Sequence, residues 1–268
     1  MDFVEFHIIE RIESMLRTSD QAEELTALKR YAESLKKRLE GINEKLFRSV
    51  RENIQSGNCT GADLKRQLEE YVDSDSYERT PDEIGYDSLD MFVNGLLRTG
   101  VVPEETKERE PEMVFYQPTP ARIVLQLIEK ANITKDDVFY DLGSGLGQVP
   151  ILVNLLSGAR AKGIEFEPAY CDYARQCARR LNLPRVEFIN VDAREADYSD
   201  GDVFFMYTPF EGGLLQEVLE RLEGESRKRK IRIYTYGPCT LQVSNQSWLE
   251  RLDQNANNVY RLAVFRSV

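Results

Sequence analysis

Histidine is almost absent from this sequence, since a single one, His7, stands among 268 residues. Catalysis by a Ser-His-Asp or Cys-His arrangement therefore has almost no support, because the only histidine lies far along the chain from every motif discussed below. A metal site built on several histidines is excluded by the count. The sequence favours chemistry that needs no dedicated strong base, and we expect no metal ion.

Cysteines and long apolar runs are also scarce. Cys59, Cys171, Cys177 and Cys239 form no C-x-x-C pair, which speaks against zinc and predicts reduced thiols. No apolar stretch approaches the roughly 18 residues that a membrane span needs. The first residues lack the basic region of a signal peptide. We therefore expect a cytoplasmic protein without a membrane partner.

Basic charge is in deficit, with 35 Lys and Arg against 46 Asp and Glu and a net charge of -11. Proteins that mainly hold nucleic acid usually carry a basic surface, so nucleic acid is the less favoured partner. A basic run at residues 227–230 is more typical of a solvated loop than of a grip for an acidic partner. The balance fits an enzyme, or a protein with a basic partner.

Residues 1–112 predict a helical N-terminal domain. Apolar residues recur at spacings of three and four over residues 25–54, close to the seam of a coiled coil. The seam consists of Leu25, Leu28, Ala32, Leu35, Leu39, Ile42 and Leu46, followed by Val50 and Ile54. Such a stripe packs on neighbouring helices of the same chain, which we favour, or pairs with a second copy. We therefore expect a monomer or a helix-mediated dimer.

Other helices of this domain are predicted at residues 1–17, 61–72 and 87–98, with a loop at 73–76. The polar stretch 99–112 contains two prolines and is typical of a linker or a mobile cover. The domain would serve to cover the substrate, to pack or to dimerise.

Residues 113–268 change to strands that alternate with helices, which predicts an α/β domain with a parallel sheet. The last two strands form a hairpin joined by residues 253–258. The predicted strands span residues 138–142, 160–165, 186–190, 202–207, 230–236, 247–252 and 259–267. The predicted helices span residues 119–131, 147–157, 168–182 and 212–223.

A glycine-rich turn, residues 141–148, follows the first strand with the sequence Asp-Leu-Gly-Ser-Gly-Leu-Gly-Gln. Its glycines are spaced G-x-G-x-G, unlike the G-x-G-x-x-G of dinucleotide-binding proteins. They let the chain turn sharply and let a ligand approach the backbone. Because Asp141 stands at its start, the turn suits a ligand with an amino group better than a phosphate.

Two further acids follow the next strands. Glu165 ends the second strand, 22 residues after Gly143, where a carboxylate can accept hydrogen bonds from both ribose hydroxyls of an adenosine. Alternation along the strand favours Glu165 over Glu167 for this role. Asp192 follows the third strand and is placed to accept from an adenine amino group, although an acid there often only caps a turn.

Together these residues make the chain similar to the class I S-adenosylmethionine-dependent methyltransferases. The resemblance covers residues 113–268 and implies a Rossmann-like seven-stranded sheet with an antiparallel last strand. It implies S-adenosyl-L-methionine as the cofactor, with Asp141 near the methionine amino group, Glu165 on the ribose and Asp192 on the adenine. The implied cofactor-binding residues are Tyr116, Thr119, Asp141, Gly143, Ser144, Gly145, Gln148, Glu165, Phe166, Asp192, Ala193 and Tyr207.

Within this class, the glycine turn is most like that of the non-SET lysine methyltransferases that modify histones. Those enzymes have Asn-Asn-Phe after the fourth strand, and nucleic-acid amino methyltransferases have Asp/Asn-Pro-Pro-Tyr/Phe. This chain has Tyr207-Thr208-Pro209-Phe210 instead, so neither substrate carries over. We rank protein side chains, including lysine, first among acceptors, then small molecules, then nucleic acids.

Methyl transfer from a sulfonium is an in-line displacement, for which orientation alone can lower the barrier by roughly 7–11 kcal/mol. We expect Tyr116, Tyr207 and Phe210 to line the acceptor channel as the catalytic residues. A plain core role for Tyr207 and Phe210 stays open. Two other classes also remain: a nicotinamide-dependent enzyme, which the glycine spacing disfavours, and a non-catalytic module that only binds S-adenosylmethionine.

Overall fold

The computed structural model describes residues 14, 22–72, 86–99, 101–253 and 258–268. The helix predicted at residues 1–17, apart from residue 14, and the loop predicted at 73–76 lie outside this part of the chain. The chain forms two compact units that divide between Asn53 and Ile54. The functional division into residues 1–112 and 113–268 stays a prediction.

The first unit contains all but the last two residues of the long helix that the sequence predicts, α2, which spans Ala22–Gln55. Ion pairs one turn apart stabilise its surface, such as Lys29 with Glu33 at 3.7 Å. Three residues of the predicted seam are strongly exposed, with Leu28 at 50%, Leu35 at 42% and Ile42 at 53%. The expectation of a monomer or a helix-mediated dimer stays a prediction.

The second unit is built on a seven-stranded sheet with the order β3-β2-β1-β4-β5-β7-β6. Parallel pairing joins the first five of these strands, and β7 runs antiparallel to both β5 and β6. The predicted seven-stranded Rossmann-like sheet with an antiparallel last strand is therefore confirmed. The strands are β1 Val138–Leu142, β2 Arg160–Glu165, β3 Val186–Asn190, β4 Val203–Tyr207, β5 Arg232–Tyr236, β6 Leu249–Arg251 and β7 Ala263–Ser267.

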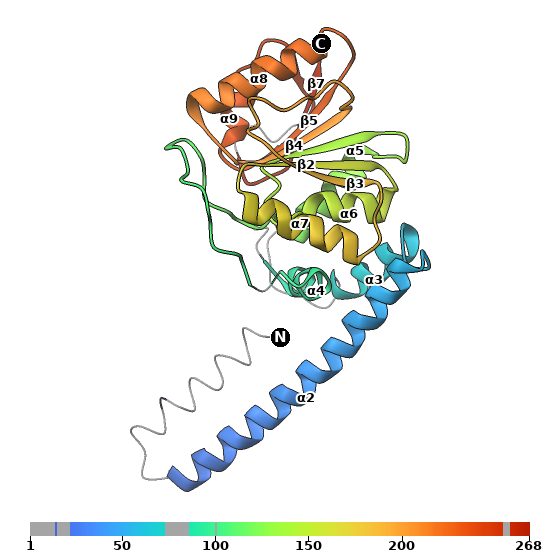
Figure 1. Cartoon of the computed structure of the whole chain (residues 1–268), viewed down its shortest axis with the longest axis vertical. Coiled ribbons are helices and arrows are strands. Elements are labelled where there is room, and N and C mark those ends of the chain that lie inside the picture. Colours follow the sequence, from blue (N-terminus) through green and yellow to red (C-terminus); the bar gives the residue numbers. More distant parts are fainter. Residues whose placement is uncertain (1–13, 15–21, 73–85, 100, 254–257) are drawn as a thin grey trace. The chain divides into compact units, whose positions relative to one another are not determined.

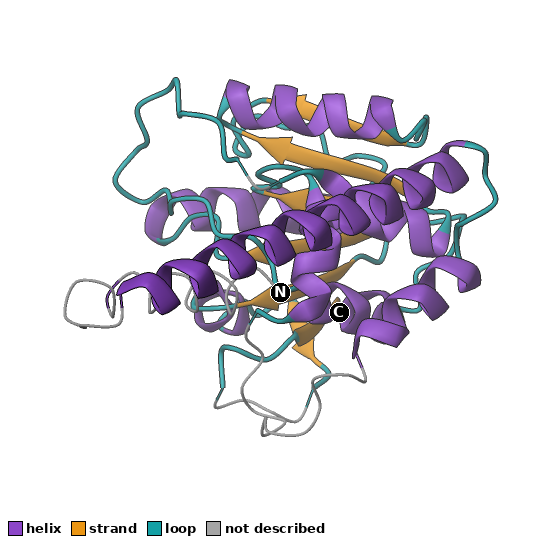
Figure 2. Ribbon diagram, turned by 90° about the horizontal axis from the view of Figure 1, so that it is seen from below, coloured by secondary structure: helices purple, strands orange, loops and turns teal. Residues whose placement is uncertain are grey.

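Helices cover both faces of this sheet (Figures 1 and 2). On one face α6 packs against β1 and β2, and α7 packs against β2 and β3. Helix α6 also contacts α5 and α3, and α4 packs on both of these helices, while α8 and α9 cover the other face. The helices are α3 Ala62–Val72, α4 Ser88–Leu97, α5 Ala121–Ala131, α6 Gln148–Ser157, α7 Pro168–Arg180, α8 Gly212–Ser226 and α9 Cys239–Ser244.

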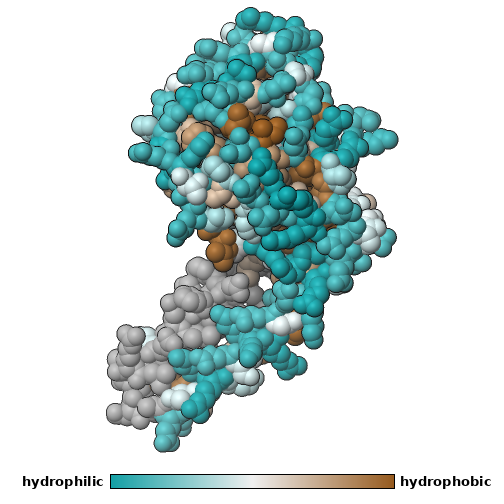
Figure 3. Space-filling model, viewed as in Figure 1, coloured by the Kyte–Doolittle hydropathy of each residue, from teal (hydrophilic) through white to brown (hydrophobic). Residues whose placement is uncertain are grey.

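The core on the α8 side consists of alternate residues of the central strands and one apolar face of α8. Tyr140, Phe204 and Met206 from the strands meet Leu215, Leu219 and other apolar residues of the helix, and all of these side chains are buried. The outer surface of this unit is mostly hydrophilic in the view of Figure 3, with a few apolar side chains gathered near its middle. This core fixes the strand ends, on which the site depends.

Helix α9 is a feature that the periodicity does not predict. It has only six residues, two of which, Thr240 and Val243, are β-branched and therefore weak helix formers. It is stabilised by packing, because Cys239, Thr240 and Val243 are buried. The two strands of the predicted hairpin are also shorter than expected, although their antiparallel pairing is confirmed.

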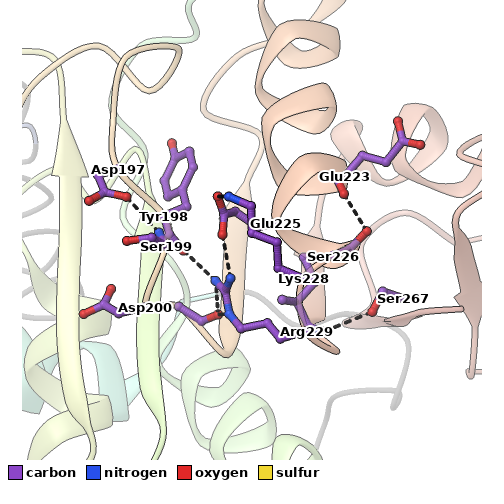
Figure 4. Close-up of polar contacts among 12 residues, drawn as sticks. Asp197, Tyr198, Ser199, Asp200, Glu223, Glu225, Ser226, Lys228, Arg229 and Ser267 are labelled. Carbon is purple, nitrogen blue, oxygen red and sulfur yellow. Dashed lines mark hydrogen bonds and ion pairs between the residues drawn. The ribbon is translucent and has the colours of Figure 1, made fainter.

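The basic run at residues 227–230 connects the end of α8 to the loop between β3 and β4 (Figure 4). Arg229 donates to the carbonyl oxygens of Tyr198 and Gly201 at 2.6 and 2.8 Å, and it pairs with Glu225 at 2.6 Å. Lys228 pairs with the same carboxylate at 2.9 Å. These cations therefore have partners within the unit, which favours a structural role over a grip for an acidic partner.

Buried Asp90 joins α4 to α5. One carboxylate oxygen accepts from the backbone N–H of Asp87, and the other accepts from that of Ala121, both at 2.8 Å. Burial raises the pKa of Asp90 from 3.8 to about 6. The folded state therefore holds this proton more tightly than the unfolded chain does.

The stabilisation from protonated Asp90 is expected in full below the unfolded pKa of 3.8 and lost as the pH rises through about 6. The free energy of unfolding of wild type minus that of Asp90→Asn should fall by about 2 kcal/mol between these two pH values. Urea unfolding of both proteins across this range measures the difference. A difference that stays constant or grows with pH would contradict the expectation.

Candidate active site

A cavity opens where β1, β2, β3 and β4 end, beside the point at which the strand order reverses between β1 and β4. In open α/β sheets this is where ligands bind. About 850 Å³ of space outside the protein atoms belongs to this cavity when the open solvent at its mouth is included. Predicted site residues that line it are Tyr116, Gly143, Gly145, Glu165, Phe166, Asp192, Ala193, Tyr207 and Phe210.

The glycine turn brings backbone to the cavity at two positions. Gly143 has φ 81° and Gly145 has φ 51°, a region that side chains rarely adopt. A Cβ atom on Gly143 would lie 2.2 Å from Cβ of Pro209, and one on Gly145 would lie 2.4 Å from Cε2 of Tyr116. These positions therefore need glycine both for conformation and for close approach.

Four predicted cofactor-binding residues are buried but do not line the cavity: Thr119, Asp141, Ser144 and Gln148. Gln148 begins α6 and donates to the carbonyl oxygen of Thr119 at 2.9 Å. This bond fixes the segment that carries Tyr116. The hydroxyl of Ser144 is buried and has no hydrogen-bond partner among the residues that the structure describes.

Two carboxyl groups carry the electrostatics of the site. Burial raises the pKa of Asp141 well above its usual value, and the nearby Glu165 raises it further. Burial also raises the pKa of Glu165. A cation bound near both groups would lower these pKa values and favour the charged carboxylates. The site thus has the electrostatics of a receptor for a positively charged ligand.

Glu165 also holds the glycine turn. One of its carboxylate oxygens accepts from the backbone N–H of Gly145 at 2.7 Å, and the other accepts from that of Glu167 at 2.8 Å. Glu165 is thereby fixed in position at the cavity wall.

The turn after β4 closes the cavity on its other side. Thr208 is held at φ 39°, which is rare for a β-branched residue, and such strain concentrates at functional sites. Tyr207 lines the cavity and donates from its hydroxyl to Gln117 at 3.2 Å. Phe210 lines the cavity too, yet it also belongs to the buried core, so both interpretations of this ring have a structural basis.

The cover, defined here as residues 105–112, is tied across the ends of three strands. Glu167 after β2 accepts from Thr106 and Lys107, and Arg194 after β3 pairs with Glu110. At the turn after β4, Glu112 accepts from the N–H of Leu214 at 2.7 Å. The sequence predicts this stretch as part of a linker or mobile cover; in the structure it forms part of the cavity wall.

Several residues of the cavity wall are not among the predicted site residues. Glu105 and Arg109 come from the cover, whose polar composition resembles that of any linker. Tyr170 and Leu214 lie in the first turns of α7 and α8, directly after β2 and β4. Position after a strand end is the signal that could have found these two.

Comparison with known proteins gives two sequence matches. The family described as "Histone methylation protein DOT1" matches residues 112–211, which run from the end of the cover through the glycine turn to the turn after β4. A "Protein-lysine N-methyltransferase" from Saccharolobus islandicus is 28% identical over 117 residues, which cover 43% of this chain and 69% of that protein.

Solved structures are similar as well. An RNA methyltransferase from Salinibacter ruber in complex with S-adenosyl-L-homocysteine is 26% identical, with a TM-score of 0.44 over 56% of this chain and 92% of that chain. A putative methyltransferase from Escherichia coli is 17% identical, with a TM-score of 0.47 over 55% of this chain and 86% of that chain.

This chain is a class I methyltransferase that uses S-adenosylmethionine. The family match spans the glycine turn, Glu165 and Asp192, the residues on which the sequence-based prediction rested. The cofactor fits the site, because the cavity lies at the strand ends where such sheets bind ligands, and two buried carboxyl groups favour a cation.

Two negative findings concern the described residues of the methyltransferase. None of the helices there is long and apolar enough to cross a membrane. Within the same residues, no group of three or more His, Cys, Asp or Glu side chains is arranged to hold a metal ion.

Gly145→Ala is expected to lower the free energy of unfolding by roughly 1–3 kcal/mol, from the left-handed φ and the contact with Tyr116. Urea unfolding measures it, with Gly224→Ala as the matched control because a Cβ there meets nothing within 4 Å. In a Tyr116→Ala background the cost of Gly145→Ala should shrink. An unchanged cost in that background would show that the ring is not the obstacle.

Proposed function

We propose that this methyltransferase transfers the methyl group to the side-chain nitrogen of protein lysines. The observation that carries the proposal is the family match over residues 112–211. This range includes the glycines and acids expected to bind the cofactor and the aromatic residues that line the cavity. The lysine methyltransferase from Saccharolobus islandicus supports the same acceptor. A net charge of -11 suits a basic protein substrate.

In this proposal, different residues of the site contact the methionine, ribose and adenine parts of the cofactor. Gly143 and Gly145 line the cavity where the methionine part would bind, and Asp141 lies near its amino group. Glu165 accepts from the ribose hydroxyls, and Asp192 accepts from the adenine amino group. When bound, S-adenosylmethionine supplies an electrophilic methyl group on a sulfonium.

Tyr116, Tyr207 and Phe210 line the acceptor side. Burial raises the pKa of Tyr207 above 10, so at neutral pH its phenol stays protonated and is no base. Its hydroxyl instead donates to Gln117. The rings therefore exclude water and align the neutral amine with the methyl group, while the proton of the lysine ammonium leaves to solvent before attack.

Glu165→Gln is expected to weaken binding of S-adenosylhomocysteine by about 10- to 100-fold, because the ribose loses a charged acceptor. Titration calorimetry measures the affinity. Glu187→Gln, an exposed acid on β3, is the matched control and should bind as wild type does. Equal affinities of wild type and Glu165→Gln, with both folded, would remove Glu165 from the cofactor site.

The acceptor is tested with a cell lysate and radiolabelled S-adenosylmethionine. We expect the label to enter protein, to survive nuclease and to be lost when lysines are blocked beforehand by acetylation, which leaves an amide nitrogen that accepts no methyl group. Mass spectrometry should place it on lysine nitrogen.

Label that persists after lysine blocking, or that enters nucleic acid or small molecules, would overturn the lysine proposal. No label at all from a protein that binds S-adenosylhomocysteine would favour a non-catalytic module.

A further inference from the structure

Asp192 is not a free carboxylate at the cavity wall, because Arg194 clamps it. Oδ1 accepts from the backbone N–H of Arg194 at 2.8 Å and from its Nε at 3.0 Å. Oδ2 accepts from the Nη2 atom of the same residue at 2.7 Å. This two-point contact between a planar guanidinium and a carboxylate fixes the direction of both oxygens.

The contact with Arg194 leaves one defined acceptor position on the Asp192 carboxylate. A carboxylate offers about four lone-pair positions, two on each oxygen. Arg194 fills both positions on Oδ1 and one on Oδ2, so one position on Oδ2 remains. Asp192 lines the cavity and is half-buried, so a ligand can reach it.

The same guanidinium reaches the cover. Its Nη2 atom also pairs with Glu110, so a single side chain connects Asp192 to this segment. The cover also contacts two residues that follow β2. The ammonium of Lys107 lies 4.2 Å from the centroid of the Phe166 ring, and Glu105 accepts from the hydroxyl of Tyr170 at 3.0 Å. Phe166 and Tyr170 both line the cavity.

We propose that Arg194 is a positioning residue that aims Asp192 at the amino group of the adenine and, through Glu110, couples adenine recognition to the cover. The inference rests on the proposed role of Asp192 in the cofactor site. In this proposal the adenine amino group donates to the Asp192 carboxylate. Arg194 contacts that carboxylate, and it acts on the adenine through it. Binding of the adenine then strengthens the attachment of the cover, and an attached cover tightens the adenosine site.

The proposal predicts a preference that depends on the atom at purine position 6. S-adenosylhomocysteine carries an amino group there, which donates to Asp192, whereas S-inosylhomocysteine carries an oxo group, which a carboxylate repels. Titration calorimetry with both ligands should give wild type about a tenfold preference for the adenosyl compound. Asp192→Asn should bring this preference close to one, because an amide can also donate to an oxo group.

Arg194→Ala and Arg194→Lys are the decisive variants. Both remove the planar fork, so the preference for the adenosyl compound should fall about threefold or more, with Lys restoring little despite its charge. Arg266→Ala is the matched control, because Arg266 pairs with Glu250 at 2.7 Å and does not line the cavity. If Arg194 only stabilised the fold, affinity for both ligands would fall equally and the preference would persist.

Coupling to the cover is measured by limited trypsin digestion, since exposed Lys107 and Arg109 lie within it. S-adenosylhomocysteine should slow cleavage in wild type at least fivefold more than in Glu110→Gln. Equal protection of both proteins would overturn the coupling.

The outcomes separate the inference from its premise. A wild-type protein without the preference, or an Asp192→Asn variant that keeps it, removes the role of Asp192. A preference that depends on Asp192 and survives Arg194→Ala refutes the positioning role alone.

Discussion

The hydrogen bond between Glu165 and the backbone of Gly145 is the contact on which the site depends. It connects the end of β2 to the turn after β1, so two adjacent strands and one buried carboxyl group define a single wall. Burial raises the pKa of Glu165 and of its neighbour Asp141, because the charged carboxylates are disfavoured there. A positive charge bound beside them would favour the charged forms. A sulfonium that also carries an ammonium group supplies that charge, and this explains how one receptor can hold the methionine and adenosine parts together.

Acidic side chains perform two different tasks around this wall. Asp141, Glu165 and Asp192 end or follow the three strands and belong to the cavity or its floor. Glu167 and Glu110 hold the cover, the first by accepting from Thr106 and Lys107 and the second by pairing with Arg194. The arrangement places the anchors of the cover two residues after Glu165 and Asp192. In the proposed coupling, a change at the cover would be transmitted over a short distance to Glu165 and Asp192.

The sheet could be predicted well from the sequence, because strands such as β1 and β4 are short apolar runs that alternate with helical segments. The family of the chain followed from residues 141–148 together with Glu165 and Asp192. Periodicity could not find α9, whose six residues depend on packing. It also could not find the anchored cover, because the bonds of Glu167 and Arg194 join residues about 60 and 84 positions apart. Nor could spacing show that Arg194 already donates to most of the lone-pair positions of the Asp192 carboxylate.

A structure of the methyltransferase with bound S-adenosylhomocysteine tests the central claim most directly. The account predicts the ribose hydroxyls within hydrogen-bond distance of Glu165, the adenine amino group at Oδ2 of Asp192, and the sulfur facing the rings of Tyr116 and Tyr207. Adenosine bound elsewhere, or a cavity in which Glu165 faces the sulfur end, would contradict it.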